Sequence, residues 1–398
     1  MKKPKLMTIV AILCATTLVA FAHGTMTTVY KVDTKSCTYK VIPSEQLPDA
    51  KAQGMEPTLP AYDSTLSTPM YSDDGRLAFF NNEICRAQST VGWYYSPKLR
   101  MYAADGRTRM TLFEQIPSYE NVNWYIEPPA RMVKEGKSKY VIKSETDQYR
   151  KEGWNTAEFS DGLHPLSNQL KTFISGKKGK YGIYIKNLKD GKSLTINDGA
   201  YSSASILKLF IMAGVYDGIN KGNIKNTPTV QNNLKKMITI SDNYASNCLV
   251  KTIGGGNYRK GFDTENALTK SLGCYNTQHM SLYPGYKEFV SYGRNLTSPL
   301  DCGLLLEKIY NCTLVSPKYS DEMLSLLKNQ QRRTKIPYSL PKGTVCANKT
   351  GETDSVQSDV GIVYSPGADY IICVLTNNAP TGMQDIRQIS KIVYDYFN

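Results

Sequence analysis

The chain has 398 residues, of which 41% are hydrophobic and 21% are charged, so it is long enough for more than one globular domain. Its formal net charge of +13 comes from basic residues that are dispersed rather than clustered, which favours attraction to anionic polymers or lipids over nucleic-acid binding. The three histidines, at positions 23, 164 and 279, are scattered and no Cys-x-x-Cys pair occurs, which argues against a zinc site and a Ser-His triad. We therefore expect neither a metal nor a cofactor.

The first 22 residues are typical of a secretory signal peptide. Lysines at positions 2, 3 and 5 precede an apolar run over residues 7–21, and Ala20-Phe21-Ala22 supplies the small residues of a cleavage site. We expect a mature chain that starts near His23 and is secreted or associated with the cell envelope, with no membrane span after cleavage. Eight of the nine cysteines would remain. Their spacing gives no unique pairing, and the oligomeric state stays open.

Residues 23–68 are predicted to be an irregular lead-in, and residues 69–155 contain an internal repeat. The segment Met70-Tyr-Ser-Asp-Asp-Gly-Arg76 recurs 31 residues later as Met101-Tyr-Ala-Ala-Asp-Gly-Arg107, and a frayed third copy starts at Met132. The three tryptophans, at positions 93, 124 and 154, share one repeat position to within one residue. This spacing predicts about three 31-residue units, each with a strand, a tight turn, a second strand and a short helix.

The aromatic residues of these repeats have two interpretations. In the first they are simply the core of each unit, because repeats of this size bury a shared core by stacking on their neighbours. In the second they stack on sugar rings, in a module that binds anionic cell-wall polymers. A linker is predicted over residues 156–164, which contain Asp161-Gly162.

Residues 165–398 are predicted to form an α+β domain. We expect a helix over residues 166–176 and a hairpin over residues 181–196, closed by Asp190-Gly191. Strands over residues 359–364 and 370–376 complete an antiparallel sheet, and an amphipathic helix over residues 384–397 follows them.

The first chemical motif of this domain is Ser205-x-x-Lys208. The dense apolar residues that follow Ser205 predict a buried helix, and residues three apart share a helix face. A buried lysine that has lost its proton can accept the serine proton, which makes Ser205 a candidate nucleophile. Taken alone, the motif is more typical of a helix that Ser205 caps and on whose surface Lys208 lies.

Two further motifs change this balance. Ser241-Asp242-Asn243 follows an amphipathic stretch and brings a second hydroxyl and a carboxamide, although such a triplet is by itself most simply a helix cap. Lys349-Thr350-Gly351 ends an apolar strand, where the lysine and the hydroxyl can bind a carboxylate and the glycine allows close backbone approach.

In this order the motifs resemble those of class A β-lactamases and penicillin-binding D,D-peptidases. The resemblance covers residues 165–398 and implies a two-lobed fold, with a five-stranded antiparallel sheet flanked by helices and a separate α-helical lobe. It implies that Ser205 is the acylated nucleophile, that Lys208 is its general base or the partner of that base, and that Ser241 passes a proton to the leaving nitrogen.

The resemblance also implies how a β-lactam or D-Ala-D-Ala peptide substrate is bound. Asn243 would hold a substrate amide, and Lys349 with Thr350 would hold the substrate carboxylate. The backbone N–H groups of Ser205 and Glu352 would form the oxyanion hole. The carboxylate of Glu352 would then lie near a site that must attract an anion.

Two departures from the class A pattern separate the possible functions. Ser205 and Ser241 are only 36 residues apart, so the walls of the cleft are shortened. No E-x-x-L-N segment, whose glutamate activates the deacylating water in class A enzymes, occurs between Ser271 and Pro299. Glu288 is a candidate for the missing general base. The simpler interpretation is that Glu288 is a solvated helix residue with no catalytic role.

The main hypothesis is therefore an exported serine hydrolase that opens β-lactam amides through an acyl-enzyme on Ser205. The first alternative is a penicillin-binding D,D-carboxypeptidase or another peptidoglycan-processing enzyme with slow deacylation. The second is a non-catalytic protein that binds cell-wall muropeptides. Intact Ser205, Lys208, Ser241 and Lys349 argue against the non-catalytic alternative.

Overall fold

The computed structural model describes residues 129–285 and 289–398, with side chains from Ala130 onward, and the backbone of short strands between residues 27 and 125. The predicted signal peptide lies outside the described residues, and so does Glu288. No helix in the described part of the chain is long and apolar enough to cross a membrane.

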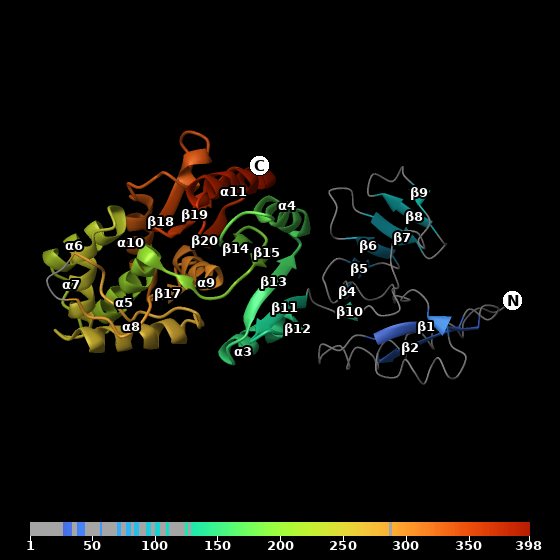
Figure 1. Ribbon diagram of the computed structural model, residues 1–398, viewed down its shortest axis with the longest axis horizontal. Coiled ribbons are helices and arrows are strands. Elements are labelled where there is room, and N and C mark those ends of the chain that lie inside the picture. Colours follow the sequence, from blue (N-terminus) through green and yellow to red (C-terminus); the bar gives the residue numbers. More distant parts are fainter. Residues whose placement is uncertain are drawn as a thin grey trace. The chain divides into compact units, whose positions relative to one another are not determined.

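The N-terminal strands form two sheets (Figure 1). One is three-stranded, in the order β2-β1-β3, and the other is seven-stranded, in the order β10-β4-β5-β6-β7-β8-β9. The bounds are β1 Thr27–Asp33, β2 Thr38–Pro43, β3 Glu56–Pro57, β4 Met70–Ser72, β5 Leu77–Phe80, β6 Glu83–Arg86, β7 Trp93–Ser96, β8 Arg100–Ala103, β9 Arg109–Met110 and β10 Trp124–Tyr125. The lead-in is thus not irregular throughout, because β-branched and aromatic residues in β1 and β2 favour strands.

The third repeat copy is described completely. Strand β11 (Pro129–Lys134) turns at Glu135-Gly136, both with positive φ, into antiparallel β12 (Lys137–Ile142). A 3₁₀ turn, η4 (Lys143–Glu145), and the short helix α3 (Thr146–Lys151) follow. In the first two copies β4 pairs with β5 and β8 pairs with β9, both antiparallel. Their predicted helices lie outside the described residues, so the repeat module stays a prediction.

The chain divides into two compact units, one of residues 1–149 and 159–168 and one of residues 150–158 and 169–398. The second unit carries the three motifs. In this unit β15, β14, β20, β19 and β18 are neighbours in one sheet, in that order. The strand bounds are β13 Asn155–Asp161, β14 Lys180–Asn187, β15 Ser193–Ile196, β18 Val345–Thr353, β19 Val356–Tyr364 and β20 Tyr370–Asn377.

The five neighbouring strands β15, β14, β20, β19 and β18 form the antiparallel sheet that the family resemblance implies. One sequence-based prediction needs correction here. Residues 156–164 were predicted to be a linker, whereas residues 155–161 form β13, in which Thr156, Ala157, Phe159 and Ser160 are buried. Along β13 two buried residues lie between single half-buried residues, and Asp161-Gly162 marks only the end of the strand.

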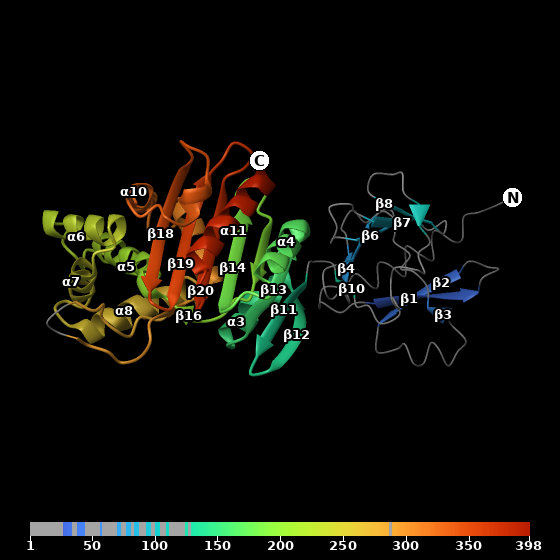
Figure 2. The same ribbon diagram turned by 45° about the horizontal axis from the view of Figure 1, so that its top comes forward.

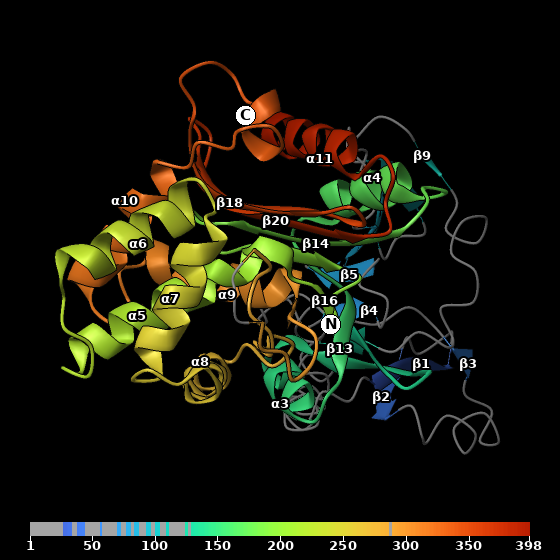
Figure 3. The ribbon, with the colours of Figure 1, turned by 60° about the vertical axis from the view of Figure 1, so that its left-hand side comes forward.

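Helices cover both faces of this sheet, which explains why β19 and β20 are buried along almost their whole length. Helix α11 (Gly382–Phe397) packs against β19 and β20 on one face (Figure 2). Helix α9 (Pro299–Tyr310) packs against β14, β19 and β20 on the opposite face (Figure 3). The helix predicted over residues 166–176 is α4 (His164–Ile174).

The remaining helices form the α-helical lobe, whose centre is α5 (Lys208–Asn220). Every residue from Lys208 to Tyr216 is buried, as the dense apolar pattern after Ser205 predicts. Helix α5 packs against its neighbours α6 (Pro228–Thr239), α7 (Asn243–Ile253) and α8 (Tyr258–Ser271), while α10 (Pro317–Lys328) packs against α6. A small pair of strands, β16 (Tyr201–Ser202) and β17 (Leu296–Thr297), joins the start of this lobe to the segment before α9.

Candidate active site

Ser205 lies in a 3₁₀ turn, η5 (Ala204–Leu207), that runs directly into α5. Ala204 has a φ of 42°, a left-handed conformation that is strained for a residue with a side chain. Ser205 is half-buried, whereas Ile206 and Leu207 are buried and anchor the turn. The buried side chains of Ile206 and Leu207 thus hold the strained backbone of Ala204 in place.

Lys208 is fully buried and its ammonium group has three hydrogen-bond acceptors. Nζ donates to the carbonyl oxygen of Ser241 at 2.7 Å, to Oδ1 of Asn243 at 2.8 Å and to Oγ of Ser241 at 3.2 Å. Burial lowers the pKa of Lys208 to about 7, and the positive charge of Arg332 adds to this effect. Near neutral pH, Lys208 can therefore accept a proton.

Lys208 was expected to lie beside the Ser205 hydroxyl, but its hydrogen bonds go to Ser241 and Asn243. Among the described residues, none makes a hydrogen bond to Ser205 Oγ, and Lys208 instead holds the Ser241 loop. Catalytic hydrogen bonds are commonly loose in the free enzyme and tighten when substrate binds. The half-buried Oγ is thus free to turn toward a substrate carbonyl.

The Ser241-Asp242-Asn243 motif forms the turn between α6 and α7. Ser241 has a φ of 64°, a second left-handed residue with a side chain. Asp242 is the N-cap of α7, and its Oδ1 accepts a hydrogen bond from the backbone N–H of Ala245 at 2.7 Å. Asn243 starts α7 and also donates from Nδ2 to the carbonyl oxygen of Pro284 at 3.2 Å.

The Lys349-Thr350-Gly351 motif lies inside β18, which continues to Thr353 rather than ending at Lys349. Lys349 is fully buried, and its Nζ donates to Ser241 Oγ at 2.9 Å and to the carbonyl oxygen of Thr350 at 2.7 Å. Burial, followed by the positive charge of Lys208, lowers the pKa of Lys349 well below its ordinary value. The three motifs therefore meet at one hydroxyl, Ser241 Oγ.

Gly351 allows β18 to approach the turn that carries Ser205. A Cβ atom at this position would lie 2.9 Å from Cγ1 of Ile206 and 3.1 Å from the carbonyl oxygen of Ser203. Only glycine avoids these contacts without movement of the turn. The strand thus runs close beside η5, where the backbone N–H groups of Ser205 and Glu352 are expected to form the oxyanion hole.

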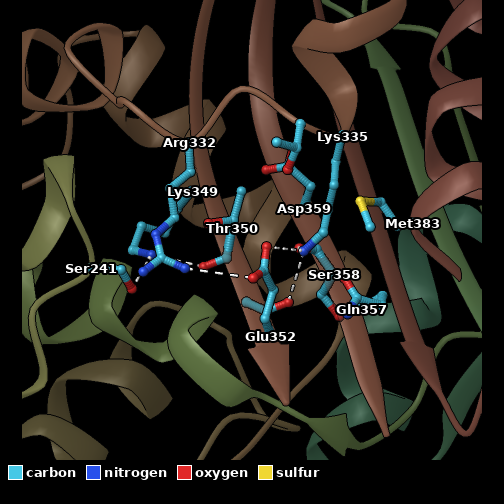
Figure 4. A network of polar contacts seen from close by, with 12 residues as sticks. Ser241, Arg332, Lys335, Lys349, Thr350, Glu352, Gln357, Ser358, Asp359 and Met383 are labelled. Atoms are coloured by element: carbon cyan, nitrogen blue, oxygen red, sulfur yellow. Dashed lines mark hydrogen bonds and ion pairs between the residues drawn. The ribbon is translucent and has the colours of Figure 1, made fainter. Parts of the chain in front are cut away.

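The carboxylate of Glu352 is neutralised by two cations that the motifs do not include (Figure 4). Lys335 Nζ lies 2.9 Å from its Oε1, and Arg332 Nη1 lies 3.5 Å from its Oε2. Burial raises the pKa of Glu352, but the hydrogen bond from Lys335 and the neighbouring positive charges outweigh burial and lower the pKa overall. Glu352 is therefore ionised and paired, so it opposes an incoming anion less than an isolated carboxylate would.

Tyr283 is a further residue of the site that the sequence motifs do not reveal. Lys208 Nζ lies 4.4 Å from the centre of its ring, and the phenol donates to the carbonyl oxygen of Ala204 at 3.3 Å. Asn247 fixes the Tyr283 backbone, since its Nδ2 donates to the Tyr283 carbonyl and its Oδ1 accepts from the Tyr283 N–H, both at 2.9 Å. Tyr283 thus closes one side of the Lys208 pocket.

Comparison with known proteins agrees with this geometry. The model of the beta-lactamase enzyme family matches residues 165–231 and 225–397, which is more than half of the chain. Beta-lactamase VEB-1 of Pseudomonas aeruginosa is 23% identical over 274 residues, which cover 58% of this chain and 90% of that protein.

Solved structures show the same fold. PBP-A is 28% identical with a TM-score of 0.52, and the match covers 58% of this chain and 95% of PBP-A. A mutant of PBP-A, solved as an acyl-enzyme complex with penicillin G, matches with a TM-score of 0.51. The beta-lactamase of Sphaerobacter thermophilus is 21% identical with a TM-score of 0.51, covering 59% of this chain and 97% of that one. The chain therefore belongs to the beta-lactamase enzyme family.

Proposed function

We propose that the protein is an acyl-serine enzyme in which Ser205 attacks the amide carbonyl of a β-lactam or of a D-Ala-D-Ala peptide. The observation that carries this proposal is the position of Ser241 Oγ, within hydrogen-bond reach of both Lys208 and Lys349. A hydroxyl that accepts from two amines has its own proton free to donate. Such a proton is what the leaving nitrogen of an amide requires.

The reaction follows from the charges of the buried groups. Neutral Lys208 accepts the proton of Ser205 as its Oγ bonds to the substrate carbonyl carbon. The carbonyl oxygen becomes an anion, which the N–H groups of Ser205 and Glu352 bind. Ser241 then donates its proton to the departing nitrogen and regains one from Lys208, which leaves an ester on Ser205 and a neutral amine.

Asn243 and the Lys349–Thr350 pair supply the remaining substrate contacts in this proposal. Arg332, which is partly exposed, places positive charge at this end of the site, while burial and the neighbouring cations favour the neutral form of Lys349 until an anion binds beside it. A substrate carboxylate is attracted to this positive charge, and the Thr350 hydroxyl can donate to it. Both a penicillin and a peptide that ends in D-Ala carry a carboxylate.

We propose that the acyl-enzyme persists, which makes this a penicillin-binding enzyme rather than an efficient β-lactamase. Within residues 130–285 and 289–398, no carboxylate lies at ion-pair distance from Lys208, and the Tyr283 ring covers it instead. Deacylation needs a group that activates water. The PBP-A mutant that was solved as an acyl-enzyme complex with penicillin G supports this choice.

Turnover of β-lactams is the second candidate function. A pKa of about 7 allows Lys208 itself to activate water, and membership of the beta-lactamase enzyme family favours hydrolysis. Export through residues 1–22 and attachment to anionic wall polymers through the repeats are also proposals, based on the sequence patterns described above.

A chromogenic cephalosporin separates these functions in one time course. A burst of colour equal to the enzyme concentration, followed by a slow phase, is the result that this proposal predicts. Sustained colour release would contradict slow deacylation and show β-lactam turnover instead. No colour beyond that of a Ser205→Ala control would leave only the non-catalytic, muropeptide-binding alternative.

A further inference from the structure

Lys335 is a fully buried lysine to which the proposed reaction gives no step. It precedes the 3₁₀ turn η6 (Ile336–Ser339), outside the three motifs. Its Nζ donates to the carbonyl oxygen of Gly351 and to that of Ser358, both at 3.2 Å, and to Glu352 Oε1 at 2.9 Å. A buried charge with three defined acceptors is a fixed element of the structure, because each contact offsets part of its desolvation cost.

Two of these contacts, to the Gly351 carbonyl and to the Glu352 carboxylate, lie on either side of the Gly351–Glu352 peptide bond. The Gly351 carbonyl and the Glu352 N–H belong to the same peptide, and they point in opposite directions because no cis peptide occurs in the described residues. Lys335 binds carbonyl oxygens of both β18 and β19, so it lies toward β19 from this peptide. The Glu352 N–H therefore points away from β19.

The direction away from β19 leads to the edge of the sheet. Strand β18 is the last in the sheet order, and η5 lies beside it at Gly351, where an added Cβ would be 3.2 Å from the backbone nitrogen of Ile206. The Glu352 N–H consequently points to the side of the strand on which Ser205 lies. This is the direction that an oxyanion donor needs.

A cation that binds the carbonyl oxygen of a peptide increases the hydrogen-bond donor strength of the N–H group of the same peptide. Hydrogen bonds to a charged donor are about twice as strong as neutral ones, and hydrogen-bonded groups polarise one another. The ammonium group draws electron density toward the Gly351 oxygen, which makes the Glu352 N–H a stronger donor. The contact of Lys335 with the Gly351 oxygen also opposes rotation of this peptide plane when negative charge develops on the substrate oxygen.

The Glu352 side chain adds an electrostatic reason for Lys335. Without compensation, its carboxylate would oppose the negative charge that forms on the substrate oxygen. Asp359 holds the surrounding segment, since its Oδ2 accepts from the Ile336 N–H at 3.0 Å and its Oδ1 accepts from Asn348 Nδ2 at 2.9 Å. Figure 4 shows Lys335 beside Glu352, with Asp359 and Ser358 from the neighbouring strand next to it.

We propose that Lys335 is a positioning residue of the oxyanion hole, which orients and polarises the Gly351–Glu352 peptide so that the Glu352 N–H binds the developing oxyanion. This inference rests on the proposed acylation of Ser205. Lys335 acts through the peptide and does not touch the substrate.

The test compares the acyl-enzymes that penicillin G, labelled with ¹³C at its β-lactam carbonyl, forms with the full-length protein and its variants. The infrared stretching band of the ester carbonyl reports hydrogen bonding in the oxyanion hole directly. Lys335→Met should move this band to higher wavenumber and slow acylation about 10- to 100-fold, less than the about 100- to 1,000-fold that follows loss of a whole oxyanion donor. Lys342→Met, the same change at an exposed lysine before β18, is the matched control.

A second pair of variants covers the case in which Lys335→Met does not fold. The double variant Lys335→Met with Glu352→Gln leaves no unpaired carboxylate at position 352, and comparison with Glu352→Gln alone removes the Glu352 ion pair from the effect and leaves the contacts of Lys335 to the Gly351 and Ser358 carbonyls and its interaction with Asp359. An unchanged band and acylation rate in these folded variants would overturn the inference and leave Lys335 a purely structural residue. Absence of any penicillin adduct on the unaltered protein would instead contradict the proposed function, and the oxyanion-hole inference would fall with it.

Discussion

Lys349 and Ser241 are 108 positions apart in the sequence, and a hydrogen bond of 2.9 Å joins Lys349 Nζ to Ser241 Oγ. Lys208 Nζ lies 3.2 Å from the same oxygen. Both lysines are fully buried, and the charge of Lys208 adds to burial in lowering the pKa of Lys349. The hydroxyl thus connects the amine of the Ser-x-x-Lys motif to the amine of the Lys-Thr-Gly motif.

Ser241→Ala tests this connection. Removal of the hydroxyl takes away the proton donor for the leaving nitrogen, so acylation by penicillin G should slow by about 100- to 10,000-fold, the range of general acid catalysis. Stopped acylation reactions followed by intact mass give the rate. Ser246→Ala removes a hydroxyl one turn further along α7, which donates to the Asp242 carbonyl, and serves as the control. Equal rates for the two variants would exclude Ser241 from proton transfer.

The acylation rate should depend on pH through Lys208. Only the neutral amine accepts the serine proton, and burial lowers the pKa of Lys208 to about 7, so the rate should rise with pH, reach half its maximum near pH 7 and level off above it. Lys208→Arg keeps the charge but cannot lose a proton, and it should abolish this rise. A rate that is flat between pH 5 and pH 9 in the unaltered protein would be inconsistent with Lys208 as the base.

Tyr283 should control both the pH midpoint and the lifetime of the acyl-enzyme. Tyr283→Ala removes a cation–π contact worth about 0.5–2 kcal/mol, which favours charged Lys208, but it also admits water, and burial is the largest cause of the lowered pKa. The second effect is larger, so the midpoint should move to higher pH and deacylation should accelerate. Loss of the adduct over time, followed by mass, measures the lifetime.

Tyr283→Phe is the matched variant, because it keeps the ring over Lys208 and removes only the hydrogen bond to the Ala204 carbonyl. It should retain the pH midpoint and the slow deacylation. If Tyr283→Ala behaved like Tyr283→Phe, the ring would have no part in shielding Lys208.

Gly351→Ala should impair acylation more than it impairs folding. The added methyl group would lie 2.9 Å from Ile206 Cγ1, which forces β18 away from the turn that carries Ser205. Overpacking of this kind costs about 1–3 kcal/mol in the free energy of unfolding. A displacement of the oxyanion donor near 1 Å can slow acylation by about 100-fold. Thermal unfolding together with acylation kinetics distinguishes this result from simple loss of the folded protein.

The parts that the sequence predicts well are those in which local pattern and packing agree. The buried run after Ser205, the hairpin of β14 and β15 and the helix α11 follow from their hydrophobic periodicity. The α+β fold and the meeting of the three motifs follow from the family resemblance. The linker predicted over residues 156–164 was wrong, because residues 155–161 form β13, and neither their polar composition nor the Asp161-Gly162 pair indicates a strand.

Tyr283 and Lys335 could not be found from the sequence, because long-range contacts give them their roles. Tyr283 reaches Lys208 only because Asn247, 36 residues earlier, holds its backbone. Lys335 ends the short basic stretch Arg332-Arg333-Thr334-Lys335, a composition typical of the surface, and it is buried through long-range contacts such as those to the Gly351 and Ser358 carbonyls. Charge in the sequence therefore did not indicate burial in the structure.

The central claim is that Ser205 forms a covalent ester. Its most direct test is peptide mapping by mass spectrometry after the full-length protein has reacted with penicillin G near pH 8, where Lys208 is mostly neutral. The account predicts one penicilloyl group per molecule, located on the peptide that contains Ser205 and absent from Ser205→Ala. An adduct on another residue, or one that Ser205→Ala still forms, would contradict it.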